Sequence, residues 1–268
     1  MLLFKIRTYL VFIICVVALV FLPYMGQAKS PFLRIRVIFD NVRYAKQLET
    51  AWGFSCIIEG MPQVILFDTG LDGNILLANM AKMGIDPRNV NAVFLSHIHG
   101  DHIGGLGVFL QQNPRVTVYL PASFPASLKK SITGTGAKVR ALDKPEKLFD
   151  KVYTTGELDS WIKEQSLVID TPKGLVIVTG CAHPGVVQIV SHTKNWLKKE
   201  VYLLMGGFHL GGQPLGELQR VAEELKKLGV QKVAPSHCTG EAARKLFRQL
   251  WGRNFIESGV GAVIELQP

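Results

Sequence analysis

Cysteine is scarce in this sequence of 268 residues, which contains four in all. Cys15 follows Ile14 inside an apolar run, where a lipoprotein signal needs a small residue, so no lipid anchor is expected. If the N-terminal segment is removed, three cysteines remain, and an odd number excludes a framework in which every cysteine is paired. We expect Cys56 to pack in the core. Cys181 and Cys238 lie close to histidines and could be metal ligands, a disulfide or packed small residues.

Long apolar segments are lacking outside the N-terminus. The run from Thr8 to Leu22 is shorter than the roughly 20 residues that a membrane-spanning helix needs. It follows two basic residues and precedes the small residues Gly26-Gln27-Ala28, a pattern typical of a secretory signal peptide. We therefore predict a signal peptide over residues 1–28, with an uncleaved N-terminal membrane anchor as the alternative. The protein is then exported, either periplasmic or secreted, and residues 29–268 form a single domain.

Acidic residues are outnumbered by basic ones, 21 to 30, which gives a formal net charge of +9. The basic residues form short clusters such as Lys129-Lys130 and Lys226-Lys227, without a nucleic-acid recognition motif or an array of stacking aromatic residues. We expect no nucleic-acid partner, and contact with a membrane only through residues 1–28 if they stay uncleaved. A basic surface favours a small anionic substrate.

Predicted strands precede predicted helices in both halves of the chain, which indicates an α+β fold with two packed β-sheets and helices outside. Apolar runs and alternation predict strands over residues 32–40, 53–60, 63–70, 91–97, 115–121, 201–207, 232–237 and 259–266. Residues 166–180 are predicted to form a hairpin that turns at residues 172–174. Helical spacing predicts helices over residues 74–84, 106–114, 186–196, 215–229 and 240–252. The segment from Pro121 to Glu164 is the least regular, and we expect a helix, edge strands and a variable loop there.

Histidine is sparse, with seven in the chain, yet three lie in the stretch SHIHGDHIGG from Ser96 to Gly105. His97 and His99 are two residues apart, so their imidazoles point to the same side of an extended backbone. Asp101 and His102 come where the chain turns into a helix and can face a second point nearby. Imidazole and carboxylate groups suit Zn²⁺, Fe or Mn, so this stretch predicts a metal site.

Three further histidines follow predicted strands: His183, His209 and His237. Strand ends on one rim of a sheet converge in space, so we expect these side chains to join the same site. His192 lies on a polar helix face and is expected to be solvated.

The pattern H-x-H-x-D-H after an apolar strand resembles the metallo-β-lactamase superfamily. The resemblance implies an αββα sandwich of two mixed sheets packed face to face. It also implies two bound divalent metal ions, which we expect to be zinc. It implies that Asp68 in FDTG accepts a hydrogen bond from a ligand histidine, at the ring nitrogen that does not bind the metal. The ligands that it implies are His97, His99 and His183 for one ion, and Asp101, His102 and His237 for the other.

Six motifs narrow the resemblance to one subgroup: FDN (39–41), FDTG, LSHIHGDHIGGL, TGCAHPG, GGFHL and SHCTG. In this order they resemble the subgroup typified by the archaeal dihydropterin–ribofuranosylaminobenzene-phosphate synthase. The superfamily usually has a bridging aspartate at the end of a late strand, where this chain has Gly206-Gly207. We expect His209 to supply the missing ligand; otherwise it donates to the substrate or bonds to the backbone. Without the aspartate, the second ion could be bound more weakly.

Thr239 and Gly240 lie where a helix begins, and free backbone N–H groups at a helix N-terminus bind phosphate or carboxylate. We predict an anion site there, with ordinary N-capping by Thr239 as the alternative.

The main functional prediction is a metal-dependent hydrolase acting on a small, anionic ester, lactone or phosphoester in the cell envelope. Metal ions lower the pKa of bound water, and Asp101 would act as the catalytic residue for proton transfer. The sequence offers no separate serine or cysteine nucleophile with a histidine–aspartate relay. Three alternatives stay open: a synthase or transferase like the methanopterin-pathway enzyme, a zinc β-lactamase, and a non-catalytic metal-bearing protein. The predicted export argues against the synthase, because pterin condensation is cytoplasmic.

Overall fold

The structure is a computed structural model that describes residues Leu33 to Gln267. The predicted signal peptide or anchor, residues 1–28, lies outside the described residues. Within the described part of the chain, no helix has both the length and the apolar character needed to cross a membrane.

The first β-sheet has seven strands in the order β13-β1-β2-β3-β4-β5-β6. The pairs among β13, β1, β2 and β3 are antiparallel, whereas β3 to β6 run parallel, so the sheet is mixed. Its strands are β1 (Leu33–Asp40), β2 (Phe54–Glu59), β3 (Ile65–Phe67), β4 (Ala92–Phe94), β5 (Thr117–Pro121), β6 (Lys138–Leu142) and β13 (Val263–Leu266).

The second β-sheet has six strands in the order β12-β11-β10-β9-β8-β7. Strands β10, β11 and β12 run parallel, and β7 to β10 are antiparallel neighbours. Its strands are β7 (Glu146–Phe149), β8 (Val152–Thr154), β9 (Leu167–Thr171), β10 (Gly174–Thr179), β11 (Val201–Gly207) and β12 (Lys232–Ser236).

The main core lies between the two sheets, where the alternation of strand side chains sets the inward face. Along β2, Phe54, Cys56 and Ile58 point into this core, while the intervening Ile57 packs under the helices on the other face. Cys56 is therefore a buried core residue, as expected.

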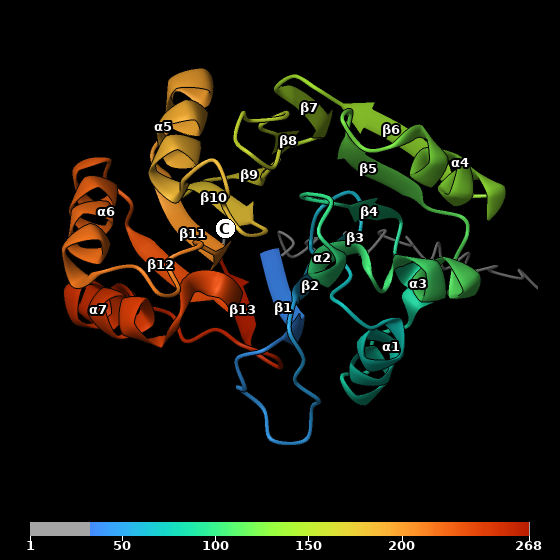
Figure 1. The fold of residues 1–268 in the computed structure, drawn as a ribbon, viewed down its shortest axis with the longest axis horizontal. Coiled ribbons are helices and arrows are strands. Elements are labelled where there is room, and N and C mark those ends of the chain that lie inside the picture. Colours follow the sequence, from blue (N-terminus) through green and yellow to red (C-terminus); the bar gives the residue numbers. More distant parts are fainter. Residues whose placement is uncertain (1–32, 268) are drawn as a thin grey trace, which may run out of the picture. The chain divides into compact units, whose positions relative to one another are not determined.

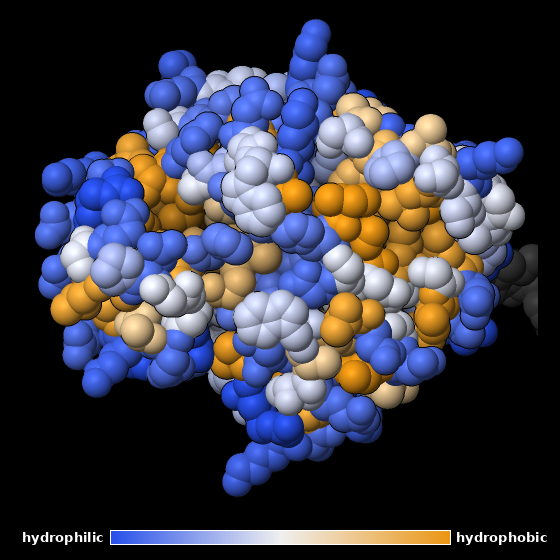
Figure 2. Space-filling model, viewed as in Figure 1, coloured by the Kyte–Doolittle hydropathy of each residue, from blue (hydrophilic) through white to orange (hydrophobic). Residues whose placement is uncertain are grey.

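Helices cover the outer face of each sheet (Figure 1). The helices on the first sheet include α1 (Gly73–Lys82), α2 (Gly100–Ile103), α3 (Leu106–Gln112) and α4 (Ala126–Gly134), and those on the second are α5 (Val186–Leu197), α6 (Leu215–Lys227) and α7 (Glu241–Trp251). This arrangement confirms the predicted sandwich of two mixed sheets with outer helices. Figure 2 shows hydrophilic residues over much of the surface in the same view, with apolar patches between them.

Six described residues other than glycine adopt the left-handed backbone conformation, and four of them lie in loops that follow strands next to the histidines. These residues follow β3, β10, β11 and β12, and they are Asp68, Ala182, His209 and His237, with φ between 50° and 60°. Each such residue costs of order 1 kcal/mol or more, and such strain clusters at functional sites. The strand ends that hold them bring the predicted ligands together.

Candidate metal centre

Four histidines are fixed at the Nδ1 atom, which leaves the Nε2 atom of each imidazole for another partner. Such support orients ligand histidines and sets their tautomer in metal sites. The pairs are His97 with Ser96 Oγ at 2.9 Å, His102 with Asp68 Oδ2 at 2.7 Å, His183 with Glu164 Oε2 at 2.8 Å and His237 with Asn41 Oδ1 at 2.8 Å.

One half of the cluster has the spacing of a four-ligand metal site. His102 Nε2 and His237 Nε2 are 3.2 Å apart, and Cys181 Sγ lies 3.2 Å from the first and 3.4 Å from the second. Asp101 Oδ2 lies 3.6 Å from His102 Nε2 and 3.3 Å from His237 Nε2. With metal–nitrogen and metal–sulfur bonds of about 2.0–2.3 Å, ligand atoms around a tetrahedral Zn²⁺ are about 3.3–3.6 Å apart. These side chains therefore fit a divalent metal.

The other half of the cluster is formed by His97, His99 and His183. Their ring centroids lie 4.6–4.9 Å from one another. His97 is fully buried, and its Nε2 has no hydrogen-bond partner among the described residues. A buried polar atom without a hydrogen-bond partner costs free energy. This nitrogen is therefore suited to bind a metal ion, which would take the place of the missing partner.

Asp101 carries a half-buried carboxyl whose predicted role in proton transfer stays a prediction. Burial raises the pKa of this carboxyl, but its hydrogen bond to His237 and the charge of His102 lower the pKa more, so the net pKa is below its usual value. A depressed pKa keeps this carboxyl ionised at neutral pH, which is the form that binds a metal ion.

Glu164 is a functional residue that the sequence analysis missed. Its buried carboxylate accepts hydrogen bonds from the backbone N–H groups of Gly180, Cys181, Ala182 and His183, at 2.8–3.1 Å, and from His183 Nδ1. Burial raises the pKa of Glu164, but nearby histidine charge and these hydrogen bonds lower it below its usual range. Glu164 thus holds the whole loop that carries His183. No motif marks it, and its only signal is an acidic residue just before a buried strand.

Asp68 and Asn41 each support one ligand histidine. Asp68 is fully buried and accepts hydrogen bonds from Ser96 N and Ser96 Oγ, both at 2.7 Å, besides its contact with His102. Burial raises the pKa of Asp68 well above its usual value. Asn41, in the motif FDN, accepts from His237, a role that the sequence analysis did not assign.

His209 lies at the exposed edge of the cluster. Its ring centroid is 4.7 Å from that of His183, and a ring nitrogen lies within 4.8 Å of the sulfur atoms of Cys181 and Cys238. The prediction that His209 is a metal ligand therefore stays a prediction. Cys181, whose role the sequence analysis left open, lies between the histidines of both halves.

Thr239 does not cap the helix that follows it. Gly240 occupies the N-cap of α7, and the buried hydroxyl of Thr239 accepts a hydrogen bond from the Phe208 N–H at 3.1 Å. The alternative of N-capping by Thr239 is therefore wrong. It fails because the hydroxyl joins the loops after β11 and β12 instead. Anion binding by Thr239 and Gly240 stays a prediction.

Two tryptophans stand beside the cluster with much of their surface exposed. Trp52 is 54% exposed, with its ring 5.0 Å from that of His237. Trp161 is 71% exposed, with its ring 5.0 Å from that of His183 and 5.7 Å from that of His99. Large exposed aromatic side chains beside a polar site are typical of ligand binding.

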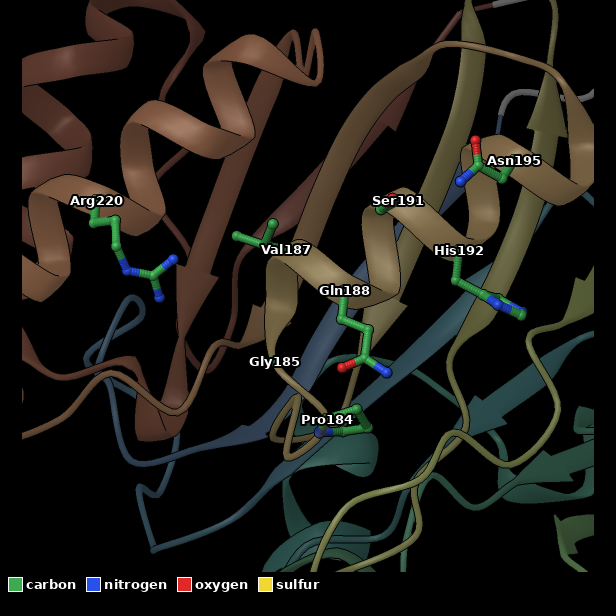
Figure 3. A pocket seen from close by; sticks show the side chains of 8 residues that line it. All are labelled: Pro184, Gly185, Val187, Gln188, Ser191, His192, Asn195 and Arg220. Carbon is green, nitrogen blue, oxygen red and sulfur yellow. The ribbon is translucent and has the colours of Figure 1, made fainter.

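A surface pocket of about 570 Å³ lies along α5 and begins at Pro184, directly after His183, but none of the candidate ligands lines it (Figure 3). His192 lines it, so this histidine is separate from the cluster. Arg220 of α6 points toward α5 in the figure, but its guanidinium is bound by Glu217 and Glu224. We assign no role to this pocket.

Residues 53–195 match the family model of the metallo-beta-lactamase superfamily. The chain belongs to this superfamily. A curated relative from Methanocaldococcus jannaschii, 7,8-dihydropterin-6-methyl-4-(beta-D-ribofuranosyl)-aminobenzene-5'-phosphate synthase, is 29% identical over 84% of this chain and 94% of its own length. An uncharacterised protein of the same organism is 26% identical over 86% of this chain and 99% of its own length. A solved structure described as Tm1679, a metal-dependent hydrolase of the beta-lactamase superfamily, has a TM-score of 0.76 at 25% identity, and the match covers 88% of this chain and all of that one.

These comparisons correct the main functional prediction. The curated relative that spans nearly the whole domain is a synthase, and nothing in the comparisons supports an envelope hydrolase. The prediction was wrong because the ligand motifs are shared across the superfamily. They indicate metal binding but do not separate hydrolysis from synthesis.

Proposed function

We propose that this protein is a metal-dependent synthase that couples a dihydropterin, through a methyl carbon, to an aromatic amine bearing a ribose phosphate. The similarity to the methanopterin-pathway enzyme over 84% of this chain and 94% of that relative carries the proposal. The export predicted from residues 1–28 counts against this coupling and itself stays a prediction. In this coupling a C–N bond forms, an anionic oxygen leaving group departs from the methyl carbon with the bonding electrons, and the amine loses a proton.

The two halves of the cluster would hold two divalent ions. The ligands would be His97, His99 and His183 for one ion, and Asp101, His102 and His237 for the other. Such ions, when bound, neutralise negative charge on a departing or bound phosphate group. We propose zinc as the resident metal, with iron and manganese as the alternatives, because imidazole and carboxylate ligands suit all three.

Trp52 and Trp161 support an aromatic substrate. Their exposed rings flank the histidine cluster from different elements, and planar heteroaromatic rings stack on such side chains. A stacked ring contributes about 1–3 kcal/mol, as measured for nucleic-acid bases on aromatic residues. The net charge of +9 is favourable for a phosphorylated partner.

The test is a coupling assay with purified full-length protein loaded with zinc, iron or manganese in turn. The donor is a 7,8-dihydropterin with diphosphate on its 6-hydroxymethyl group, and the acceptor is 4-(β-D-ribofuranosyl)aminobenzene 5'-phosphate. Mass spectrometry should detect the coupled product, together with released diphosphate, in at least one metal form. Asp101→Ala should abolish it.

A matched pair of variants tests the aromatic contact. Trp161→Leu should raise the KM for the pterin by about tenfold, from the stacking energy above. Trp196→Leu should leave the KM unchanged, because Trp196 packs against Tyr153. A folded, metal-loaded wild type that forms no coupled product with any of the three metals would overturn the proposed function.

A further inference from the structure

Gly207 lies where the superfamily usually has its bridging aspartate, and the structure leaves no space there for a side chain. A Cβ atom on Gly207 would lie 2.4 Å from the Gly180 carbonyl oxygen, 2.6 Å from Cys238 Sγ and 3.2 Å from a carbon of the His237 ring. The Cys238 side chain therefore fills the space that a bridging carboxylate would need. Another residue has to supply any group shared by the two halves.

Cys181 is positioned to supply it. It is 3% exposed, and its Sγ lies 3.2 Å from His102 Nε2 and 3.4 Å from His237 Nε2. The same sulfur lies within 4.8 Å of donor atoms of His97 and His183. Among the described residues, Cys181 belongs to three of the four groups that could hold a metal ion, more than any other residue.

The loop of Cys181 is fixed before any ion binds. Glu164 accepts the Cys181 N–H at 3.0 Å together with the N–H groups on either side of it. Ala182 has a φ of 60°, which directs the chain from Cys181 toward His183 so that both side chains face the cluster. A ligand held in this way loses little conformational entropy on binding.

We propose that the Cys181 thiolate is a ligand shared by the two metal ions, in place of the absent bridging carboxylate. It adds to Asp101, His102 and His237 on one side and to His97, His99 and His183 on the other. Thiolate is a strong ligand for zinc, and the thiol proton passes to solvent when the metal binds. This inference rests on the metal centre and not on the coupling reaction.

The experiment uses the full-length protein, freed of metal and titrated with Co²⁺ as the spectroscopic probe. Wild type should bind two ions and show a near-ultraviolet thiolate-to-cobalt charge-transfer band. Cys181→Ser should lose the band and bind the second ion at least about tenfold more weakly. Cys238→Ala and Cys56→Ala, which remove the neighbouring sulfur and a remote buried one, should keep the band.

Three results would overturn the inference. The first is a Cys181→Ser variant that binds two cobalt ions with the band and affinity of wild type. The second is loss of the band in Cys238→Ala but not in Cys181→Ser, which assigns the thiolate to the other cysteine. The third is a disulfide between Cys181 and Cys238 in the metal-loaded protein, detected by mass spectrometry after alkylation. Circular dichroism of each variant establishes that it is folded, and Cys181→Ala provides a second substitution if the serine variant is not.

Discussion

The contribution of Glu164 to stability can be calculated from its contacts. Glu164→Ala removes the acceptor of five N–H groups, four from the backbone and one from His183 Nδ1. A buried donor without an acceptor costs about 1–3 kcal/mol. Even at the low end for four backbone donors, the loss is at least about 4 kcal/mol, a large share of the 5–15 kcal/mol typical of a domain.

Urea denaturation of the metal-free full-length protein measures this loss directly. Glu146→Ala is the matched control, because Glu146 pairs with Arg140 on the surface and such pairs contribute about 0–1 kcal/mol. Glu164→Gln keeps the volume but replaces one oxygen with an amide NH₂ that opposes the N–H groups of the loop. It should cost about 2 kcal/mol and weaken metal binding about 10–100-fold. Two results would show that Glu164 does not hold this loop. One is a free energy of unfolding for Glu164→Ala within about 1 kcal/mol of the wild-type value. The other is a Glu164→Gln variant that binds metal with wild-type affinity.

Three further predictions concern single side chains around the centre. Asn41→Ala should weaken metal binding about 10–100-fold, because His237 loses the acceptor of its Nδ1–H. Competition with a chelator measures the affinity. Unchanged affinity would show that Asn41 does not orient His237. Trp161→Ala should change the free energy of unfolding by less than about 0.5 kcal/mol, since the side chain is 71% exposed. The same substitution should reduce the quenching of protein fluorescence by a dihydropterin. A large loss of stability would show that Trp161 is a packing residue. Gly207→Ala should lower the free energy of unfolding by about 1–3 kcal/mol, as measured by thermal unfolding. Adding Cys238→Ala should recover only part of this loss, because the clash with the Gly180 carbonyl remains. A Gly207→Ala variant as stable as wild type would contradict the close packing.

The clustering of the candidate ligands could be predicted from the sequence because most of their signals are local. His97, His99, Asp101 and His102 lie within six residues, and their spacing alone indicates metal binding. The distant His183 could be added because it follows a recognisable apolar strand. The sandwich could be predicted for the same reason, since alternation along strands such as β2 marks which side chains face the core.

Among the residues that hold the histidines in place, Asp68 could be predicted from the FDTG motif, and its contact with His102 agrees with that prediction. Others could not be predicted in the same way. Glu164 is 19 residues from His183, in a segment without clear periodicity, and its role depends on a loop that forms only when β9 and β10 pair. Cys181 lies inside the motif TGCAHPG, but the direction of its side chain depends on the left-handed conformation of Ala182. N-capping by Thr239 was the alternative to the predicted anion site, and only the tertiary contact with Phe208 and the N-cap at Gly240 exclude it.

Binding of two divalent metal ions that share the sulfur of Cys181 can be observed by anomalous X-ray diffraction from crystals of the zinc-loaded protein. Two zinc peaks are expected, one among His97, His99 and His183 and one among Asp101, His102 and His237. Each should lie within bonding distance of Cys181 Sγ. Zinc bound elsewhere, or no zinc in the cluster at saturating concentration, would contradict this mode of binding.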